Sequence, residues 1–255
     1  MFLSDGGYAS SRRRAQELIE SGCVSIDGKT VKKSSAPISE GEHCVCVEET
    51  LAYVSRGGLK LEAALDRFLP DLEGLTALDI GASTGGFTDC MLSRGASRVY
   101  AVDAGVGQLA QKLREDPRVI SKEKLNARTL TPADIDGARV DLIVMDVSFI
   151  SATYILPQFP LLLKDGAKAI CLIKPQFEVG RSMLGKGGIV KDPKAHRFAV
   201  ERVMAAGEAA GLTPIGIIPS PVTGGDGNRE FLICFVNGTS ETPALKIEDL
   251  SRLLS

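Results

Sequence analysis

Charged residues close several apolar runs of this 255-residue chain. Asp79, Asp103, Asp146 and Lys174 end the runs ALDIG, VYAVD, DLIVMD and ICLIKP. An acid at the end of a strand is often only a cap for the following helix. If the strands are parallel, however, their carboxyl ends meet at one edge of a sheet, where ligands bind. Charged residues at the ends of so many runs therefore predict a ligand site.

A turn rich in small residues follows the first of these runs. Such a turn between a strand and a helix lets the backbone approach a nucleotide-like ligand closely. It departs from the dinucleotide pattern G-x-G-x-x-G at the second glycine, and it lacks the lysine of a phosphate-binding P-loop. ATP hydrolysis is therefore disfavoured, whereas a dehydrogenase stays possible. The turn contains Gly81, Ser83, Gly85, Gly86 and Phe87. Asp103 fits recognition of ribose hydroxyls.

The elements that must position these residues alternate between strand and helix patterns. Strands are predicted at 75–80, 98–103, 118–121, 140–146, 168–173, 214–218 and 230–236, and helices at 86–94, 107–115, 151–163 and 193–210. This order is typical of an α/β, doubly wound, mostly parallel Rossmann-like sheet, here with seven strands. The Pro- and Gly-rich loop at 219–228 predicts an antiparallel last strand. From the residues alone, Lys60 fits a solvated helix and Glu230 a surface acid on an edge strand.

The first 47 residues form a separate small α+β block. A helix is expected from Arg12 to Ser21, then a hairpin turning at Asp27-Gly28, then a strand at 43–47. Residues 10–35 carry an excess of three positive charges. By charge alone, these side chains fit a solvated helix face. We divide the chain into this block, a linker at 48–58, the α/β domain at 59–238 and a C-terminal tail at 239–255.

Composition excludes several classes of protein. The net charge of −2 gives no overall signal for nucleic acid. The six cysteines form no C-x-x-C pair, so we expect neither a metal site nor a disulfide framework. Charged residues and prolines interrupt the longest apolar region, 140–163, so no membrane span is expected. No signal segment is recognised at the N-terminus. These features predict a cytoplasmic protein without a membrane partner.

Several spaced motifs resemble a known family. Residues 54–237, with SRGGLKL, LDIGASTGGFTD, VDAGVGQL, DLIVMDVSFIS, LIKPQFEVG, GGIVKDP and GNREFL, look like an FtsJ-like class I methyltransferase. The N-terminal block resembles an S4 RNA-binding domain whose first helix is clipped. Together they resemble the hemolysin-A-type ribosomal RNA 2′-O-methyltransferases. The resemblance implies S-adenosylmethionine as cofactor, ribosomal RNA as partner and a cytidine ribose as target.

The resemblance also implies a Lys-Asp-Lys-Glu tetrad, which falls on Lys60, Asp146, Lys174 and Glu230. Methyl transfer to a hydroxyl needs a positioned oxygen and an acceptor for its proton. We assign Lys174 as the base and Asp146 as its orienting partner. Lys60 and Glu230 would position the substrate.

We also predict which residues contact the cofactor and the RNA. We expect Asp79 and the turn from Gly81 to Phe87 near the methionine part of the cofactor, Asp103 at its ribose and Asn126 near its adenine. Asp146 is expected to contact the cofactor as well. Asn126 could equally be a turn residue. Predicted RNA contacts are Arg12, Arg13, Arg14, Lys32, Lys33, Arg181 and Lys186. An RNA-binding protein with an inactive methyltransferase domain and a membrane-lysing protein are the alternative readings.

Overall fold

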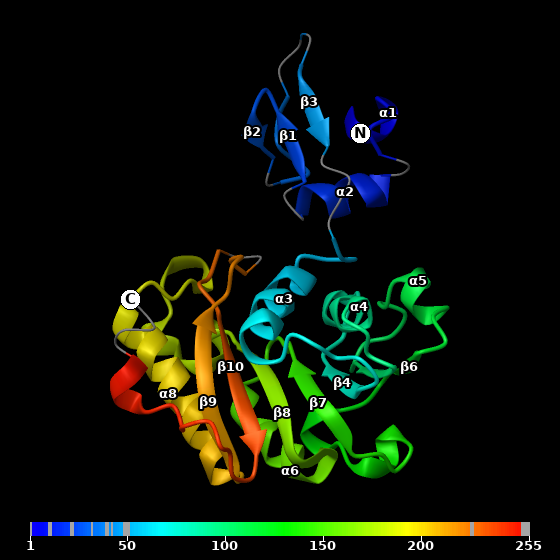
Figure 1. Ribbon diagram of the computed structural model, residues 1–255. Helices are drawn as coiled ribbons and strands as arrows, with labels where there is room; N and C mark the ends of the chain where they lie inside the picture. The colour runs from blue at the N-terminus through cyan, green and yellow to red at the C-terminus, as the bar shows by residue number, and fades with distance from the viewer. Residues whose placement is uncertain are drawn as a thin grey trace.

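The N-terminal block folds around a small sheet of its own. The structure, a computed structural model, describes residues 2–9, 12–20, 23–31, 33–38, 41, 43–47, 52–224 and 227–250. The block consists of α1 (Phe2–Asp5), α2 (Arg12–Glu20), β1 (Val24–Ile26), β2 (Lys29–Thr30) and β3 (Val45–Val47). Its antiparallel strands lie in the order β2-β1-β3. Figure 1 shows this sheet beside α2.

The hairpin of this block has the turn that its sequence predicts. Asp27 and Gly28 both have positive φ, 51° and 75°, which suits the twist of a two-residue hairpin loop. Apolar side chains from both helices and β1 form the core of the block: Leu3, Ala15, Leu18, Ile19, Cys23 and Val24. Ser21, the expected end of α2, lies outside the described residues.

The rest of the chain is built on a seven-stranded sheet, as predicted. Its strand order is β6-β5-β4-β7-β8-β10-β9. The strands are β4 (Thr76–Ile80), β5 (Arg98–Val102), β6 (Val119–Lys122), β7 (Val140–Met145), β8 (Leu163–Ile173), β9 (Leu212–Pro219) and β10 (Phe231–Asn237). The ladders from β6 to β8 are parallel. The last strand, β10, is antiparallel to both β8 and β9, as expected, and Figure 1 shows it running opposite to β9.

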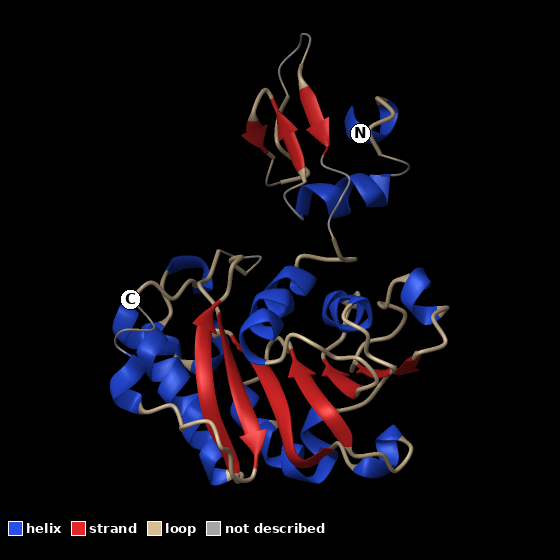
Figure 2. Ribbon diagram, in the orientation of Figure 1, coloured by secondary structure: helices blue, strands red, loops and turns tan. Residues whose placement is uncertain are grey.

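Helices cover both faces of this sheet (Figure 2). Leu78 and Ile80 of β4 pack in one core with α6 (Phe159–Leu162) and α8 (Pro193–Ala209). Ala77, on the opposite face of β4, packs with α3 (Gly57–Phe68) and α4 (Gly86–Ser93). Because side chains alternate along a strand, Asp79 also faces α3 and α4. Among the described helices, none combines the length and the apolar content that a membrane span requires.

Three sequence predictions of element bounds are wrong. The helix expected at 151–163 is broken into the 3₁₀ turns η3 (Ala152–Tyr154) and η4 (Leu156–Gln158) and the short α6. Pro157 and Pro160 lie near the starts of η4 and α6, because proline can begin a helix but cannot continue one. The helix expected at 107–115 is reduced to α5 (Gln111–Arg114). The strand expected at 168 already begins at Leu163.

Asp79 places a carboxylate inside this core. Its exposed fraction is 0%, and its Oδ2 accepts a hydrogen bond from the Thr88 hydroxyl at 2.6 Å. Burial raises the pKa of Asp79 from 3.8 to about 7, although the Thr88 hydrogen bond acts in the opposite direction. The folded protein therefore binds more protons than the unfolded chain between these two pH values. This group makes the free energy of unfolding decrease as the pH rises through that window.

We predict that Asp79→Asn removes this contribution while keeping an acceptor for Thr88. The free energy of unfolding of the variant, relative to the wild type, should increase between pH 4 and 8 by up to about 4 kcal/mol, at about 1.4 kcal/mol per pH unit. Urea unfolding followed by circular dichroism across this pH range measures the difference. A difference that stays constant with pH would show that Asp79 does not titrate in this way.

Candidate functional site

The parallel strands bring the predicted charged residues to one edge of the sheet. Asp103 directly follows β5, Asp146 follows β7 and Lys174 follows β8. The backbone N–H of Asp146 donates to the carbonyl of Ile80 at 3.0 Å, which ties the ends of β7 and β4 together. Gly81 lies at this junction with φ 85°, and a Cβ there would collide with the Asp146 carbonyl oxygen. A glycine is therefore required where the two strand ends meet.

The carboxylate of Asp103 joins the two loops that follow β4 and β5. Its Oδ2 accepts from the backbone N–H of Ser83 at 2.8 Å, and its Oδ1 accepts from Gly105 at 2.7 Å. Ser83 has φ 49°, and its hydroxyl lies 3.1 Å from the Gln108 side-chain oxygen. The N–H groups of Gly81 and Ala82 also donate to the carbonyl of Val102 at the end of β5, so these contacts fix the small-residue turn beside β5.

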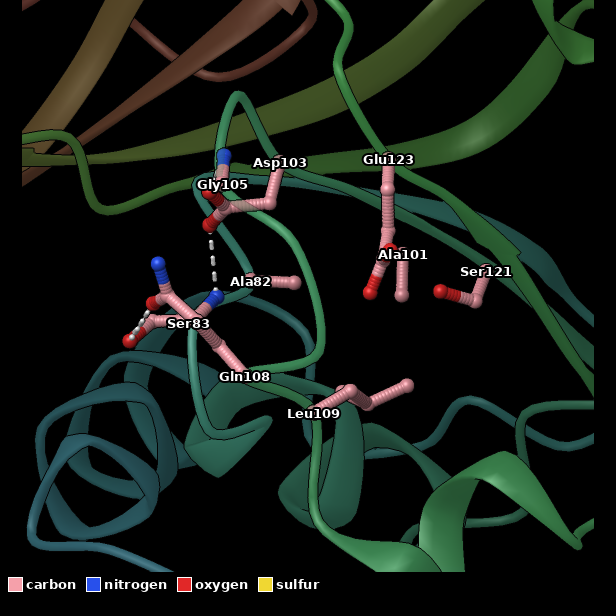
Figure 3. A pocket seen from close by; sticks show the side chains of 9 residues that line it. All are labelled: Ala82, Ser83, Ala101, Asp103, Gly105, Gln108, Leu109, Ser121 and Glu123. Carbon is pink, nitrogen blue, oxygen red and sulfur yellow. Dashed lines mark hydrogen bonds between the residues drawn. The ribbon is translucent and has the colours of Figure 1, made fainter.

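A pocket lies between this turn and the ends of β5 and β6. Its lining comprises Ala82, Ser83, Ala101, Asp103, Gly105, Gln108, Leu109, Ser121 and Glu123. Figure 3 shows Ser83 and Asp103 linked at one side of the hollow and Glu123 and Ser121 at the other. Two carboxylates and a polar turn beside an apolar floor suit a ligand that carries both hydroxyl and ring groups.

Sequence reasoning missed Glu123 and Gln108 in this pocket. Glu123 directly follows β6, so the strand-end argument used for its neighbours would have found it. Asn126, which we expected near the adenine, does not line the pocket. Its side-chain oxygen accepts from the backbone N–H of Arg128 at 3.0 Å and caps the 3₁₀ turn η1 (Ala127–Thr129). Asn126 therefore caps a turn, and its contact with the adenine stays a prediction.

The turn residues and Asp79 lie deeper than the pocket. Gly85 has φ 96° and precedes α4, and Gly86 packs against Ser55 and the start of α3. Phe87 is 3% exposed and belongs to the core beneath α3 and α4. The turn therefore serves as the rigid start of α4, and Ala82 and Ser83 are the members of it that border the open pocket.

The surface positions that the sequence alone suggested for Lys60 and Glu230 are wrong. Lys60 is 8% exposed on α3, and its Nζ lies 2.6 Å from Glu230 Oε2. Glu230, 2% exposed, directly precedes β10, which lies between β8 and β9 and is not an edge strand. Each buried charge is compensated by the other, as burial of an ion requires.

Lys174 forms the second lysine–acid pair. Its Nζ lies 2.6 Å from Asp146 Oδ1 and 2.8 Å from the hydroxyl of Ser148. Within the part of the chain that the structure describes, three buried side-chain polar atoms lack a hydrogen-bond partner: Asp79 Oδ1, Asp146 Oδ1 and Gln176 Oε1. The Lys174–Asp146 contact is therefore an ion pair without hydrogen-bond alignment.

These unpartnered acceptors bear on the ligand that the site would fit. Asp79, Asp146 and Gln176 all belong to segments at the carboxyl ends of β4, β7 and β8. Asp146 Oδ1 already faces the Lys174 ammonium, so Asp79 Oδ1 and Gln176 Oε1 are the acceptors that would favour a ligand with positive charge or N–H donors. The sulfonium and ammonium groups of S-adenosylmethionine have this chemistry, and its ribose suits Asp103. The residues present fit this cofactor.

The predicted RNA contacts are dispersed. The side chains of Arg12, Lys33, Arg181 and Lys186 are exposed. The side chains of Arg13 and Arg14, and Lys32 as a whole, lie outside the described residues.

One buried amide organises the glycine-rich segments beside Glu230. Asn228, 1% exposed, accepts from the backbone N–H of Val190 at 2.9 Å and donates to the carbonyl of Gly188 at 3.3 Å. His196 Nε2 lies 2.9 Å from the carbonyl of Val190, so this nitrogen carries the proton and donates it. The exposed Arg181 and Lys186 therefore belong to a segment that is anchored near the Lys60–Glu230 pair.

Known proteins match the chain along most of its length. The FtsJ-like methyltransferase model matches residues 53–237, and the S4 domain model matches residues 1–44. The 16S/23S rRNA (cytidine-2′-O)-methyltransferase TlyA of Mycobacterium tuberculosis is 43% identical over 245 residues, which cover 95% of this chain and 91% of that protein. Hemolysin A of Brachyspira hyodysenteriae is 39% identical, covering 92% of this chain and 98% of that one.

Solved structures agree with these matches. A protein from Streptococcus thermophilus, named a hemolysin, is 38% identical and aligns with a TM-score of 0.78, covering 99% of this chain and 92% of that one. The fibrillarin pre-rRNA processing protein of Methanococcus jannaschii shares the fold, with a TM-score of 0.57 at 19% identity, over 79% of this chain and 82% of its own. The chain belongs to the TlyA family of FtsJ-like, S-adenosylmethionine-dependent methyltransferases with an N-terminal S4 domain.

Proposed function

We propose that this protein methylates the ribose 2′-hydroxyl of a cytidine in ribosomal RNA. The observation that carries the proposal is the pair formed by Lys174 and Asp146, 2.6 Å apart, at the edge of the sheet where β4 and β7 meet. Support for the substrate comes from the M. tuberculosis relative, whose name states this reaction, and from the S4 match. Such a substrate would place the activity in the cytoplasm, with the ribosomes.

The cofactor would occupy the pocket beside the turn after β4. Asp103 and Ser83 would face its ribose, and Glu123 and Ser121 would lie toward its base. Asp146 would place negative charge near the methionine end, and Asp79 would add to it once the pH rises above its pKa of about 7. When bound, S-adenosylmethionine supplies the methyl group on a positively charged sulfur. Carboxylates near this position favour that charge, whereas they would repel the phosphates of ATP or NAD.

The chain's own part in the reaction is to orient the hydroxyl and to remove its proton. Methyl transfer is an in-line displacement, so the ribose oxygen must be held opposite the sulfur. Lys174 would first release to solvent the proton that gives it the charge paired with Asp146, and would then accept the hydroxyl proton while Asp146 and Ser148 hold its amine in place. The Lys60–Glu230 pair is buried and already formed in this structure, and it would position the nucleotide.

We predict that Lys174→Ala lowers kcat for methyl transfer to ribosomal RNA by about 100- to 10,000-fold, the usual contribution of a general base. The affinity for S-adenosylmethionine should change little, because Lys174 lies outside the pocket lining. Transfer of labelled methyl groups to ribosomal subunits measures kcat, and calorimetry measures cofactor binding. Lys164→Ala, on an exposed lysine at the start of β8, is the control. Undiminished activity of Lys174→Ala would remove the proposed base.

The pocket assignment makes a separate prediction about binding. We expect Asp103→Asn to weaken S-adenosylmethionine binding at least 10-fold, because a charged acceptor for hydroxyls is lost. Glu123→Gln should have a smaller effect, about threefold. Asp165→Asn serves as a matched control, because Asp165 is an exposed aspartate near the start of β8, at the opposite end of this strand from Lys174. Calorimetry measures the binding of S-adenosylmethionine, NAD and ATP to each variant and to the wild type. Binding heat with NAD alone would contradict the cofactor assignment.

The basic residues predict a salt-dependent contribution to RNA affinity. Arg181→Ala and Lys186→Ala should each raise the KM for ribosomal RNA several-fold without changing kcat. Each should also reduce the slope of log affinity against log salt by about one if the side chain meets a phosphate. Filter binding from low to moderate salt measures the slope, with Lys164→Ala as control. Unchanged slopes would place the RNA elsewhere on the protein.

A further inference from the structure

The partners of Lys174 depend on a segment that no strand ladder fixes. Asp146 and Ser148 both lie on the loop that follows β7, whereas Lys174 lies at the end of β8. The β7–β8 pairing ends with Met145 opposite Cys171. Beyond that point, other contacts must keep the two segments in register. This matters because a displacement of about 1 Å in a catalytic group can cost 100-fold in rate.

Glu178 makes such contacts. It ends α7 (Pro175–Glu178), the short helix that begins directly after Lys174, and it is 2% exposed. Its Oε2 accepts from the hydroxyl of Ser151 at 2.5 Å, and its Oε1 accepts from the backbone N–H of Ala152 at 2.8 Å. A single carboxylate thus bridges the segment after β8 to the loop after β7.

Both ends of this bridge are anchored. The backbone carbonyl of Glu178 accepts a hydrogen bond of 2.6 Å from Arg202 on α8, which holds α7 on the body of the domain. Ser151 also caps η3 by accepting from the N–H of Thr153 at 3.2 Å. The bridge therefore fixes the loop to the domain and does not merely join two free segments.

The loop has features that require such fixing. Phe149, between Ser148 and the bridge, has φ 65°, a strained conformation for an aromatic residue, and is 92% exposed. Strained residues keep their conformation only when their surroundings determine it. Its ring packs against Phe177, the neighbour of Glu178, at 5.3 Å between centroids. The two segments thus meet through polar atoms and through rings.

A buried acid at this place is costly. Burial raises the pKa of Glu178, although its hydrogen bonds from Ser151 and Ala152 act against the shift. An apolar residue of similar size would also leave the Ser151 hydroxyl and the Ala152 N–H without their acceptor. The bridge gives something that an apolar side chain would not, which is a directional link between two particular loops.

We propose that Glu178 is a positioning residue for methyl transfer, which holds the loop after β7 so that Asp146 and Ser148 stay aligned with Lys174. This rests on the proposed function, in which Lys174 is the base. Glu178 acts through the loop and does not touch substrate or cofactor. Its replacement should therefore change the rate and its dependence on pH, while cofactor binding in the pocket beside β5 stays intact.

The test compares one variant that shortens the side chain of Glu178 with one that keeps its length and changes its hydrogen bonding. Glu178→Asp keeps the charge but is one methylene too short for the bridge, and we expect kcat to fall about 10- to 100-fold. Glu178→Gln keeps the length and one good acceptor, and we expect a partial rescue, within about 10-fold of wild type. The pH at which the rate reaches half its maximum should shift in Glu178→Asp, because the surroundings of the base change. Glu201→Gln, a half-buried acid on α8 paired with Arg197, is the control.

Rates are counted per folded molecule, taken from the calorimetric stoichiometry of S-adenosylmethionine, so partial unfolding of one variant does not obscure the result. If both Glu178 variants keep wild-type kcat and pH profile while Lys174→Ala is inactive, the positioning role is wrong and the proposed function stands. A lower melting temperature with an unmoved pH profile would likewise reduce Glu178 to a structural role and overturn the proposal. An active Lys174→Ala would overturn the proposed base itself, whatever the Glu178 variants do.

Discussion

The close approach of β4 to β7 at the edge of the sheet is the constraint on which the site depends. A side chain at Gly81 would collide with the Asp146 carbonyl, and the Asp146 N–H donates to the carbonyl of Ile80. This contact brings the small-residue turn after β4 and Asp146 together across the point where the strand order reverses. Open α/β sheets bind ligands at such points because loops diverge there. The chemistry of the site is thus fixed first by backbone geometry.

Buried charge is the second theme of the structure. Lys60 and Glu230 compensate each other, and Lys174 is compensated by Asp146, whereas Asp79 Oδ1 is buried without a hydrogen-bond partner. Unsatisfied acceptors in a folded core cost stability, so a sequence selected for stability alone would avoid them. Asp79 Oδ1 and Gln176 Oε1 both lie toward this sheet edge, where a bound ligand would give them partners. Stability and function are in conflict at this place.

The sequence predicted the fold well because the signals were long and local. Apolar runs ending in charged residues located the strands, and Asp27-Gly28 located the hairpin. The predictions were wrong where contacts between distant parts of the chain determine the structure. The helix expected at 151–163 is divided by its prolines, and the burial of Lys60 and Glu230 depends on β10 inserting between β8 and β9. Glu123 could have been found from its position after β6, whereas the bridge made by Glu178 joins residues that no local pattern connects.

We propose that this edge of the sheet transfers a methyl group to a ribose hydroxyl of ribosomal RNA. The most direct measurement incubates purified protein and labelled S-adenosylmethionine with ribosomal subunits from cells that lack it, then maps the modification by mass spectrometry of nuclease digests. We expect methylation confined to the 2′-oxygen of cytidine. Methylation on a base, or none in any subunit while the cofactor binds, would contradict it.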